Sequence, residues 1–320
     1  MGPRIAILGA GAVGEALARA LRGRDVALWS RSAERARAAA RRSGARAVPD
    51  LARAVDEAEL VLVCARDSAL AELVARVARL ELAPRARVVL HTSGAQSARV
   101  LAALGARGFG YGALHPLVPV PPDAPAGVFE GAGFAVEAPH RSVRAVAAAL
   151  ARELGGEPFE LPTERAAQTK GRAPRRGAGR SAAARSAGSA HVPTAASERA
   201  RYHAAATLVS NGSLALVSLA LRELLPARLV RAEDRIAARA FATLLERTAK
   251  NLRALPPERA LTGPVARGDR ATLLAHLAVL PRTSAAGRAY RALSTELARL
   301  ARADGRIEAR TARTIERALR

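Results

Sequence analysis

The chain has 320 residues, of which 50% are hydrophobic, and its formal net charge is +23. This length can hold two domains with a large core, and the composition excludes a disordered chain. The sequence shows no leader pattern and no apolar run long enough to span a bilayer, so we expect a soluble, cytoplasmic protein without a membrane partner. The single cysteine, Cys64, excludes an internal disulfide, and we expect no metal site.

The basic charge by itself would suggest a nucleic-acid-binding protein. However, only Lys170 and Lys250 are lysines among the 51 basic residues, a bias typical of a GC-rich genome. Part of the charge is also local, because residues 165–201 hold nine basic side chains and one acid. Aromatic residues that could stack on bases make up only 3% of the chain. We therefore do not expect nucleic acid as a partner.

In the first half of the chain, short β-branched runs alternate with alanine-rich stretches of helical character. Alternation at this spacing predicts right-handed crossovers and a doubly wound parallel sheet, so we expect an α/β Rossmann domain over residues 1–164. The predicted strands are 5–8, 26–29, 60–64, 88–90, 134–137 and 158–161, and the predicted helices are 13–21, 33–42, 69–79, 97–104 and one that ends at 154.

The composition changes at residues 165–200, where Gly, Pro, Ser, Ala and Arg occur without apolar periodicity. Such a segment cannot bury a core, and we interpret it as a basic, flexible insert or linker. Residues 201–320 then read as an all-α domain, with an apolar stretch at 204–221 that predicts burial on every side. We expect this domain to form a homodimer. Its predicted helices are 201–223, 231–254, 269–280 and 284–319, the last with a break near 304–305.

The stretch "ILGAGAVGEAL" places Gly9, Gly11 and Gly14 between the first strand and the first helix. In a dinucleotide site the first glycine permits the tight turn, the second admits the pyrophosphate and the third lets helix and strand pack closely. The phosphates would lie at the positive helix N-terminus, near Ala12 and Val13. The alternative is a glycine turn without a ligand.

The second predicted strand ends in "ALWSRSAER", where an NAD site would have an acidic residue for the ribose hydroxyls. Ser30, Arg31 and Ser32 stand there instead. An arginine with hydroxyl groups suits the 2′-phosphate of NADP, because charge-assisted hydrogen bonds are strong. The sequence therefore favours NADP over NAD, although Ser32 can also serve only as a helix cap.

Polar side chains follow three later strands, at the edge of the sheet where ligands bind in such folds. His115, in "GALHPLVPVPP", is a candidate proton donor, because histidine exchanges protons near neutral pH. His91 is a second candidate, and for either one the alternative is a satisfied core or loop histidine. The residues that we expect near the cofactor are Arg66, Asp67, His91, Thr92 and Ser93.

The helical domain contributes "RYHAAATLVSNG", in which His203 and Ser210 are seven residues apart and so share one helix face. The Asn211-Gly212 pair could form a hairpin turn, but the flanking alanine and leucine runs favour a helix. Asn211 would orient the substrate or the nicotinamide; alternatively it only fixes the helix register.

The glycine turn and four further motifs, in this order, resemble Rossmann-like proteins with the C-terminal domain of unknown function 2520; these are "HTSGA", "LHPL", "YHAAATLVSN" and "LTGPVARGD". The resemblance covers nearly the whole chain apart from 165–200. The family is similar in architecture to pyrroline-5-carboxylate reductase, ketopantoate reductase and 6-phosphogluconate dehydrogenase. The resemblance implies a helical domain like the C-terminal domain of 6-phosphogluconate dehydrogenase and an NADP-dependent oxidoreductase whose substrate is not established. We expect this substrate to be a small carbonyl or imine that carries a carboxylate.

One feature of those relatives is missing. Their hydroxyacid dehydrogenases and ketopantoate reductases carry a catalytic lysine four residues before an asparagine, whereas Thr207 stands four residues before Asn211 here. Lys250 does not reproduce the spacing. We therefore prefer His115 or His203 as the proton donor. The alternative is an NADP(H)-binding sensor or scaffold protein without turnover.

The segment "LTGPVARGD" is similar to the loop with which pyrroline-5-carboxylate reductases hold a substrate carboxylate. An exposed arginine, a hydroxyl and free amides can bind an anion together. A stiff hinge is the alternative, since Gly and Pro are common in loops, and Asp269 is expected to cap the helix that follows. The predicted substrate-binding residues are Ser210, Thr262, Gly263, Pro264 and Arg267.

Overall fold

The computed structural model describes residues 2–163, 195–225 and 236–320, and it consists of two compact units, Met1–Ala206 and Thr207–Arg320. Most of the predicted insert at 165–200 lies outside the described residues. The last residues of this segment were predicted to be part of a flexible insert, but helix α8 (Ala195–Leu219) already begins before residue 200. The first part of α8 therefore belongs to the N-terminal unit.

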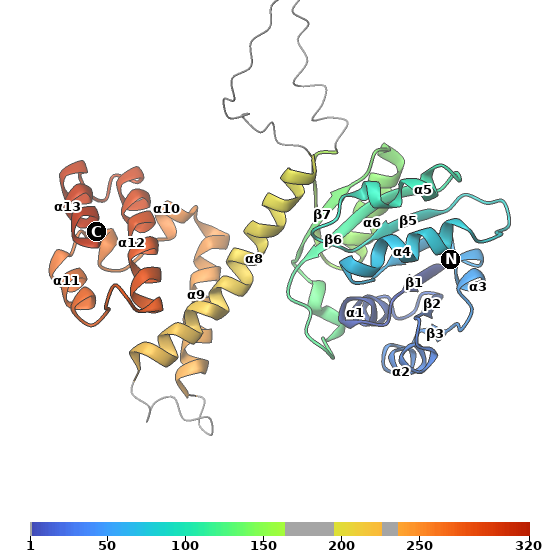
Figure 1. The fold of residues 1–320 in the computed structure, drawn as a ribbon, viewed down its shortest axis with the longest axis horizontal. Helices are drawn as coiled ribbons and strands as arrows, with labels where there is room; N and C mark the ends of the chain where they lie inside the picture. The colour runs from blue at the N-terminus through green and yellow to red at the C-terminus, as the bar shows by residue number, and fades with distance from the viewer. Residues whose placement is uncertain (1, 164–194, 226–235) are drawn as a thin grey trace, which may run out of the picture. The chain divides into compact units, whose positions relative to one another are not determined.

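The N-terminal unit is built on an eight-stranded sheet in the order β3-β2-β1-β4-β5-β6-β7-β8 (Figure 1). All neighbouring strands are parallel except β6 and β7. This confirms the predicted Rossmann fold. The strands are β1 (Ile5–Leu8), β2 (Val26–Trp29), β3 (Arg46–Ala47), β4 (Leu60–Val63), β5 (Val88–His91), β6 (Gly110–Leu117), β7 (Gly133–Glu137) and β8 (Glu157–Glu160).

Helices cover both faces of this sheet, and side chains from alternate positions of one strand enter different cores. In β1, Ile5 and Ile7 pack in one core while Ala6 and Leu8 pack in the other. Burial on both faces explains why the central strands are apolar throughout. The first core lies under α1 (Ala12–Ala20), α2 (Ala33–Ser43) and α6 (Arg141–Glu153), and the second under α3 (Leu51–Asp56), α4 (Asp67–Ala78) and α5 (Ala102–Gly105).

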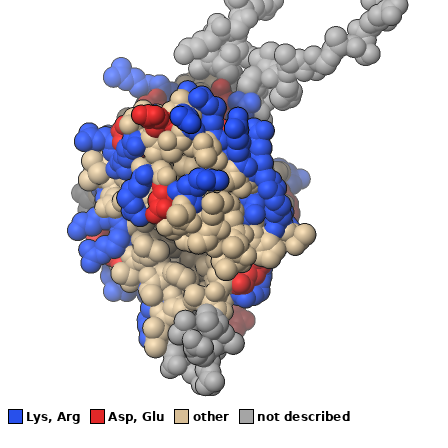
Figure 2. All heavy atoms as spheres, turned by 90° about the vertical axis from the view of Figure 1, so that its left-hand side faces the viewer, with Lys and Arg blue, Asp and Glu red and all other residues tan. Residues whose placement is uncertain are grey.

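The C-terminal unit is helical. A core of buried residues, among them Leu273, Ala298 and Ile315, joins its last three helices. The predicted break near 304–305 is confirmed, with Gly305 at φ 71°. In Figure 2, basic side chains are spread over the face that is shown, with acidic ones among them and an uncharged area between. The helices are α8, α9 (Ile236–Ala254), α10 (Pro257–Ala260), α11 (Arg270–Ala278), α12 (Ala285–Ala303) and α13 (Ala309–Leu319).

Helix α8 continues through Asn211-Gly212, so the hairpin alternative at this pair is excluded. With the π-helical turn that follows, residues Glu198–Leu224 form a helix with a hydropathy of 1.6, long and apolar enough to cross a membrane. By this criterion the expectation that no such run exists was wrong. Length and composition alone are weak grounds for a membrane span, because core helices of soluble proteins also satisfy them.

Candidate functional site

The glycine turn after β1 contains two glycines that the fold requires and one that it does not. A Cβ on Gly9, at φ 133°, would lie 2.3 Å from the Cys64 carbonyl oxygen, and one on Gly14 would lie 1.9 Å from the Gly9 oxygen. A Cβ on Gly11 would meet nothing within 4 Å. Gly11 is also the N-cap of α1, with extended backbone that any residue can adopt. The missing side chain at Gly11 therefore leaves open space in front of the helix N-terminus.

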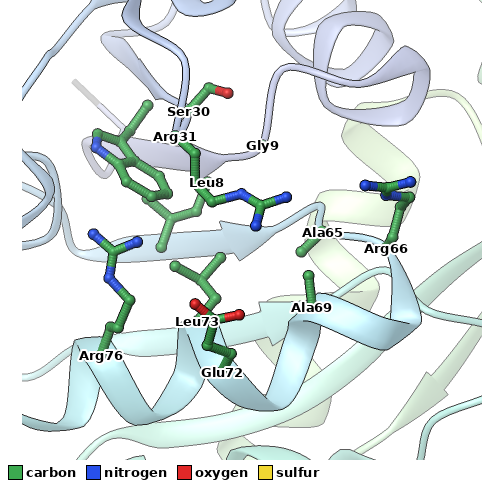
Figure 3. A pocket seen from close by; sticks show the side chains of 11 residues that line it. Leu8, Gly9, Ser30, Arg31, Ala65, Arg66, Ala69, Glu72, Leu73 and Arg76 are labelled. Atoms are coloured by element: carbon green, nitrogen blue, oxygen red, sulfur yellow. The ribbon is translucent and has the colours of Figure 1, made fainter.

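A cavity of about 110 Å³ lies beside this turn (Figure 3). Arg31 reaches across its opening from the end of β2, while Glu72 and Arg76 rise from α4. Among the described residues, none forms a hydrogen bond or ion pair with the Arg31 side chain. A guanidinium that is free at the rim of a cavity can bind an anion without first breaking an ion pair.

A second cavity, of about 640 Å³, also lies at the end of β2. It shares four lining residues with the first: Trp29, Ser30, Arg31 and Arg76. The Arg76 guanidinium lies 5.4 Å from the centroid of the Trp29 ring, which is 5% exposed. Ser32 caps α2 by accepting a hydrogen bond from the Arg35 amide at 3.2 Å. The capping role of Ser32 is thus confirmed, and Ser30 and Arg31 line the cavities.

A second polar cluster lies at the carboxyl end of β5, in β6 and at the start of α8. Nδ1 of His115 is 2.8 Å from the hydroxyl of Tyr202, and the rings of His115 and His203 stand edge to face with centroids 6.1 Å apart. A Cβ on Gly94 would lie 2.7 Å both from Nε2 of His115 and from Cδ2 of His203. Gly94 is therefore needed for the two imidazoles to approach the loop after β5.

Arg199 holds the start of α8 in this cluster. Its guanidinium donates to the carbonyl oxygens of Gly94 at 2.9 Å and Ser93 at 2.5 Å, and it pairs with Glu137 at 3.0 Å. Arg199 and Glu137 are each 3% exposed. Glu137 also accepts from the Ser97 hydroxyl at 2.8 Å. A buried charge needs such complete pairing, so the geometry of the cluster is tightly defined.

The surroundings of His115 and His91 keep these two imidazoles neutral. Burial, with the nearby charges of Arg199 and His203, lowers the pKa of His115 to about 4, against a smaller opposite effect of Asp67. Burial and the charge of Arg199 lower the pKa of His91 to about 3. At neutral pH a proton donated by His115 therefore comes from the neutral imidazole.

His91 is fully buried, and its Nδ1 accepts a hydrogen bond from the Ser93 amide at 3.2 Å. Its ring is thus a core group that shapes the loop after β5. The Thr92 side chain forms a hydrogen bond with the Cys64 thiol. Burial raises the pKa of this thiol to about 12, so it is unreactive near neutral pH. A cofactor contact by His91 would have to pass through neighbouring residues.

The cavity and the histidine cluster lie at the same edge of the sheet. Arg66 lines the cavity, and Asp67, the next residue, interacts electrostatically with His115 and Arg199. In Rossmann folds this edge, at the carboxyl ends of the strands, is where ligands bind.

Two predicted residues, Ser210 and Asn211, lie further along α8. Ser210 shares the face of His203 and is roughly 10 Å further along the helix axis. They belong to the C-terminal unit, as does the loop at residues 261–269.

Some residues of the loop at 261–269 are buried and others are exposed to solvent. Val265 and Ala266 are buried, and Gly268, at φ 66°, lies against α13. Asp269 accepts a hydrogen bond from the Thr272 amide at 3.0 Å, which confirms its capping role. The Arg267 side chain is exposed and has no hydrogen-bond or ion-pair partner within the described ranges. The other predicted contacts are Thr262, which is exposed, and Gly263 and Pro264, which are partly exposed.

Sequence reasoning missed Arg199, Glu137, Tyr202 and the role of Gly94. Arg199 was counted with the basic insert, because nothing in an arginine-rich sequence marks the one arginine that is buried. Tyr202 could have been found, since it is adjacent to His203 in a chain with three tyrosines.

Comparison with known sequences assigns both parts of the chain. Residues 3–116 match the Rossmann-like domain, and residues 173–297 match the domain of unknown function DUF2520. The chain is thus similar to Rossmann-like domains in its first part and to DUF2520 in its second. No curated protein matches the sequence.

Solved structures share this fold. A candidate NADP oxidoreductase from Bacteroides fragilis is 24% identical, with a TM-score of 0.62 over 93% of this chain and 98% of its own. A protein from Thermotoga maritima is 20% identical, with a TM-score of 0.62 over 94% of this chain and 99% of its own. Arogenate dehydrogenase from Synechocystis is 18% identical over 52% of this chain and 62% of its own, with a TM-score of 0.44.

Proposed function

We propose that this protein is an NADP-dependent oxidoreductase that transfers a hydride to or from a small carbonyl or imine substrate bearing a carboxylate. The observation that carries this proposal is the open space at Gly11, beside a cavity whose rim holds Arg31, a side chain without an ion-pair partner in the described ranges. The fold needs no glycine at position 11, whereas a bound pyrophosphate does.

The residues present fit NADP better than NAD. Ser30 and Arg31 follow β2, where an NAD site would place an acid, and Arg76 adds a second positive charge to the same cavities. The amides of Ala12 and Val13 begin α1 and would hold the pyrophosphate. Bound NADPH supplies the hydride. Arg66, Asp67, Thr92 and Ser93 would border the nicotinamide half.

The proton would come from the histidine cluster. His115 is partly exposed and neutral, and His203 lies next to it. Neutral imidazole can donate a proton to an oxygen that becomes strongly basic as a hydride arrives. In this proposal Asn211 and Ser210 orient the substrate, and Arg267, with the loop at Thr262, Gly263 and Pro264, holds its carboxylate.

Turnover tests the proposal directly. The purified chain is mixed with NADPH or NADH and a panel of short 2-oxo acids and cyclic imines, and nicotinamide absorbance is followed. We expect oxidation of NADPH with at least one member of the panel, faster than oxidation of NADH. His115→Gln should lower kcat by about 100-fold or more, because a general acid contributes about that much.

A non-catalytic NADP(H) sensor is the second candidate, favoured by Thr207 at the position of the lysine in related dehydrogenases. Tight NADPH binding without turnover on the panel would support it. Absence of binding to either nucleotide would contradict both functions.

We further propose a homodimer that works in the cytoplasm without a membrane or nucleic-acid partner. Leu208 and Val209 on α8 are 74% and 73% exposed in the single chain, which is unusual for leucine and valine on a long apolar helix. A second copy of the chain would cover them.

A further inference from the structure

The described part of the chain contains two histidine–tyrosine pairs of nearly the same geometry. Nδ1 of His115 and the Tyr202 hydroxyl are 2.8 Å apart, with ring planes at 89°. Nδ1 of His276 and the Tyr290 hydroxyl are also 2.8 Å apart, with ring planes at 84°. Only the first pair has a buried arginine beside it among the described residues, with the Arg199 guanidinium 5.8 Å from the Tyr202 ring centroid.

We propose that Tyr202 is a positioning residue, whose hydroxyl donates to Nδ1 of His115 and so fixes His115 as the neutral tautomer with its proton on Nε2. His115 then presents an Nε2–H group to the substrate oxygen. The role toward a substrate rests on the proposed function, whereas the hydrogen-bond direction and the tautomer do not.

The hydrogen bond could run either way from its geometry alone, because a tyrosine hydroxyl both donates and accepts. The charge of Arg199 favours Tyr202 as the donor. Burial raises the pKa of the Tyr202 hydroxyl, so the phenol keeps its proton, while the charge of Arg199 acts in the opposite sense. A positive charge near the phenol makes its O–H a stronger donor, since it stabilises negative charge on the oxygen. The same charge opposes a second proton on His115. The neutral imidazole therefore accepts at Nδ1 and carries its own proton on Nε2.

The environment of His115 supports this role for Arg199. The charged or titratable groups around His115 are Asp67 from α4, His91 from β5, and Arg199, Tyr202 and His203 from α8. Glu137 from β7 already takes one edge of the Arg199 guanidinium, and the Ser93 and Gly94 carbonyls take the rest. The guanidinium is thus immobilised behind Tyr202. A buried ion pair contributes little net stability, because removing both charges from water costs free energy. The buried pair of Arg199 and Glu137 therefore favours a role in the site.

Nε2 of His115 lies over Gly94, where there is no side chain to block it. When the substrate carbonyl carbon gains a hydride, its oxygen takes the proton from Nε2. In the same step Nδ1 takes the hydroxyl proton of Tyr202, which leaves a tyrosinate beside the Arg199 guanidinium and a neutral His115 with its proton on Nδ1. The tyrosinate then takes this proton back from Nδ1 as Nε2 takes a proton from solvent, which restores the starting tautomer. No charge is left on His115 at any point, which agrees with its burial.

Nitrogen NMR of the histidine side chains tests the tautomer in the full chain without cofactor or substrate. The His115 signals are assigned with His115→Gln. We expect the pattern of the Nε2–H tautomer in the wild type at pH 7. Tyr202→Phe should shift His115 toward the Nδ1–H tautomer, because the donor to Nδ1 is lost.

Tyr290→Phe is the matched control and should change only the signals of His276. An Nδ1–H tautomer in the wild type, or no change of His115 in folded Tyr202→Phe, would overturn the inference. The wild-type measurement decides even if Tyr202→Phe does not fold. Failure of NADPH to bind would overturn the proposed function and the substrate role but would leave the tautomer result intact, so the two failures are distinguishable.

If a substrate is found, Tyr202→Phe should lower kcat about tenfold or more with little change in KM, and Tyr290→Phe should change neither. A rise in KM without a change in kcat in Tyr202→Phe would contradict a role in proton delivery and indicate a binding contact instead.

Discussion

The buried histidine His91 couples the stability of the N-terminal unit to pH. Its pKa is about 3 in the folded chain, because burial and Arg199 oppose its charge, and about 6.5 when unfolded. Between these values the unfolded chain binds a proton that the folded chain does not. The free energy of unfolding therefore falls as pH decreases below about 6.5 and is unaffected by His91 above it.

We predict that His91→Asn reduces this fall by about 2 kcal/mol between pH 6.5 and pH 5, since one proton contributes about 1.4 kcal/mol per pH unit. Asparagine keeps an acceptor for the Ser93 amide. Urea unfolding of wild type and variant at both pH values measures the difference. Equal pH dependence in the two proteins would show that His91 is not the group that titrates.

At this scale the sequence identified His115 and His203 but not their partners. A histidine after a strand can be recognised by its type and position. Whether it is neutral depends on Arg199, Glu137 and Tyr202, which come from distant parts of the chain. These residues come together only in the folded chain, and no local sequence pattern predicts their contacts.

At the scale of elements, the glycine turn contains glycines that the fold requires and one, Gly11, that only a ligand would require. Gly14→Ala should lower the free energy of unfolding by about 1–3 kcal/mol, because its Cβ would overlap the Gly9 carbonyl. Gly11→Ala should leave stability within about 0.5 kcal/mol, since the space beside it is open.

For the same reason Gly11→Ala should weaken NADPH binding at least tenfold, because the methyl group would stand where the pyrophosphate approaches. Thermal unfolding and nucleotide titration of both variants measure the two effects. Unchanged NADPH affinity in Gly11→Ala would mean that the nucleotide does not bind at this turn.

The loop at 261–269 can be tested in a similar way. Asp269→Ala should lower the free energy of unfolding by about 1 kcal/mol, through loss of the α11 cap. Arg267→Ala should change it by less than about 0.5 kcal/mol, because this side chain is exposed, but should raise KM for a carboxylate substrate. If Arg267→Ala leaves KM unchanged, the loop is only a hinge.

Much of the element pattern could be predicted. The strands Ile5–Leu8 and Val26–Trp29 lie where the apolar runs indicated, because a strand buried on both faces must be apolar throughout. The two-residue strand β3 and the short helix α3 were missed, since neither has enough residues to show a period. The antiparallel pairing of β7 with β6 was also missed. The segment between them holds only a short 3-10 helix, which is too little for a crossover.

At the scale of the whole molecule, the apolar side chains on α8 predict self-association. Light scattering of the purified chain should give the mass of two copies. Leu208→Glu should shift the mass toward one copy, because a carboxylate cannot be buried in an apolar interface without a partner. Val279→Glu is the control, since Val279 is 68% exposed but lies outside α8. A wild-type mass of one copy would contradict the dimer.

The central claim, that the glycine turn binds NADP, is tested most directly by the fluorescence of Trp29. It is the only tryptophan in the chain, and it lines both cavities at the end of β2. Titration with NADPH should quench its emission at micromolar concentrations, NADH should require at least tenfold more, and Arg31→Ala should remove the difference. No quenching by either nucleotide, or equal quenching by both in the wild type, would contradict the assignment of an NADP site.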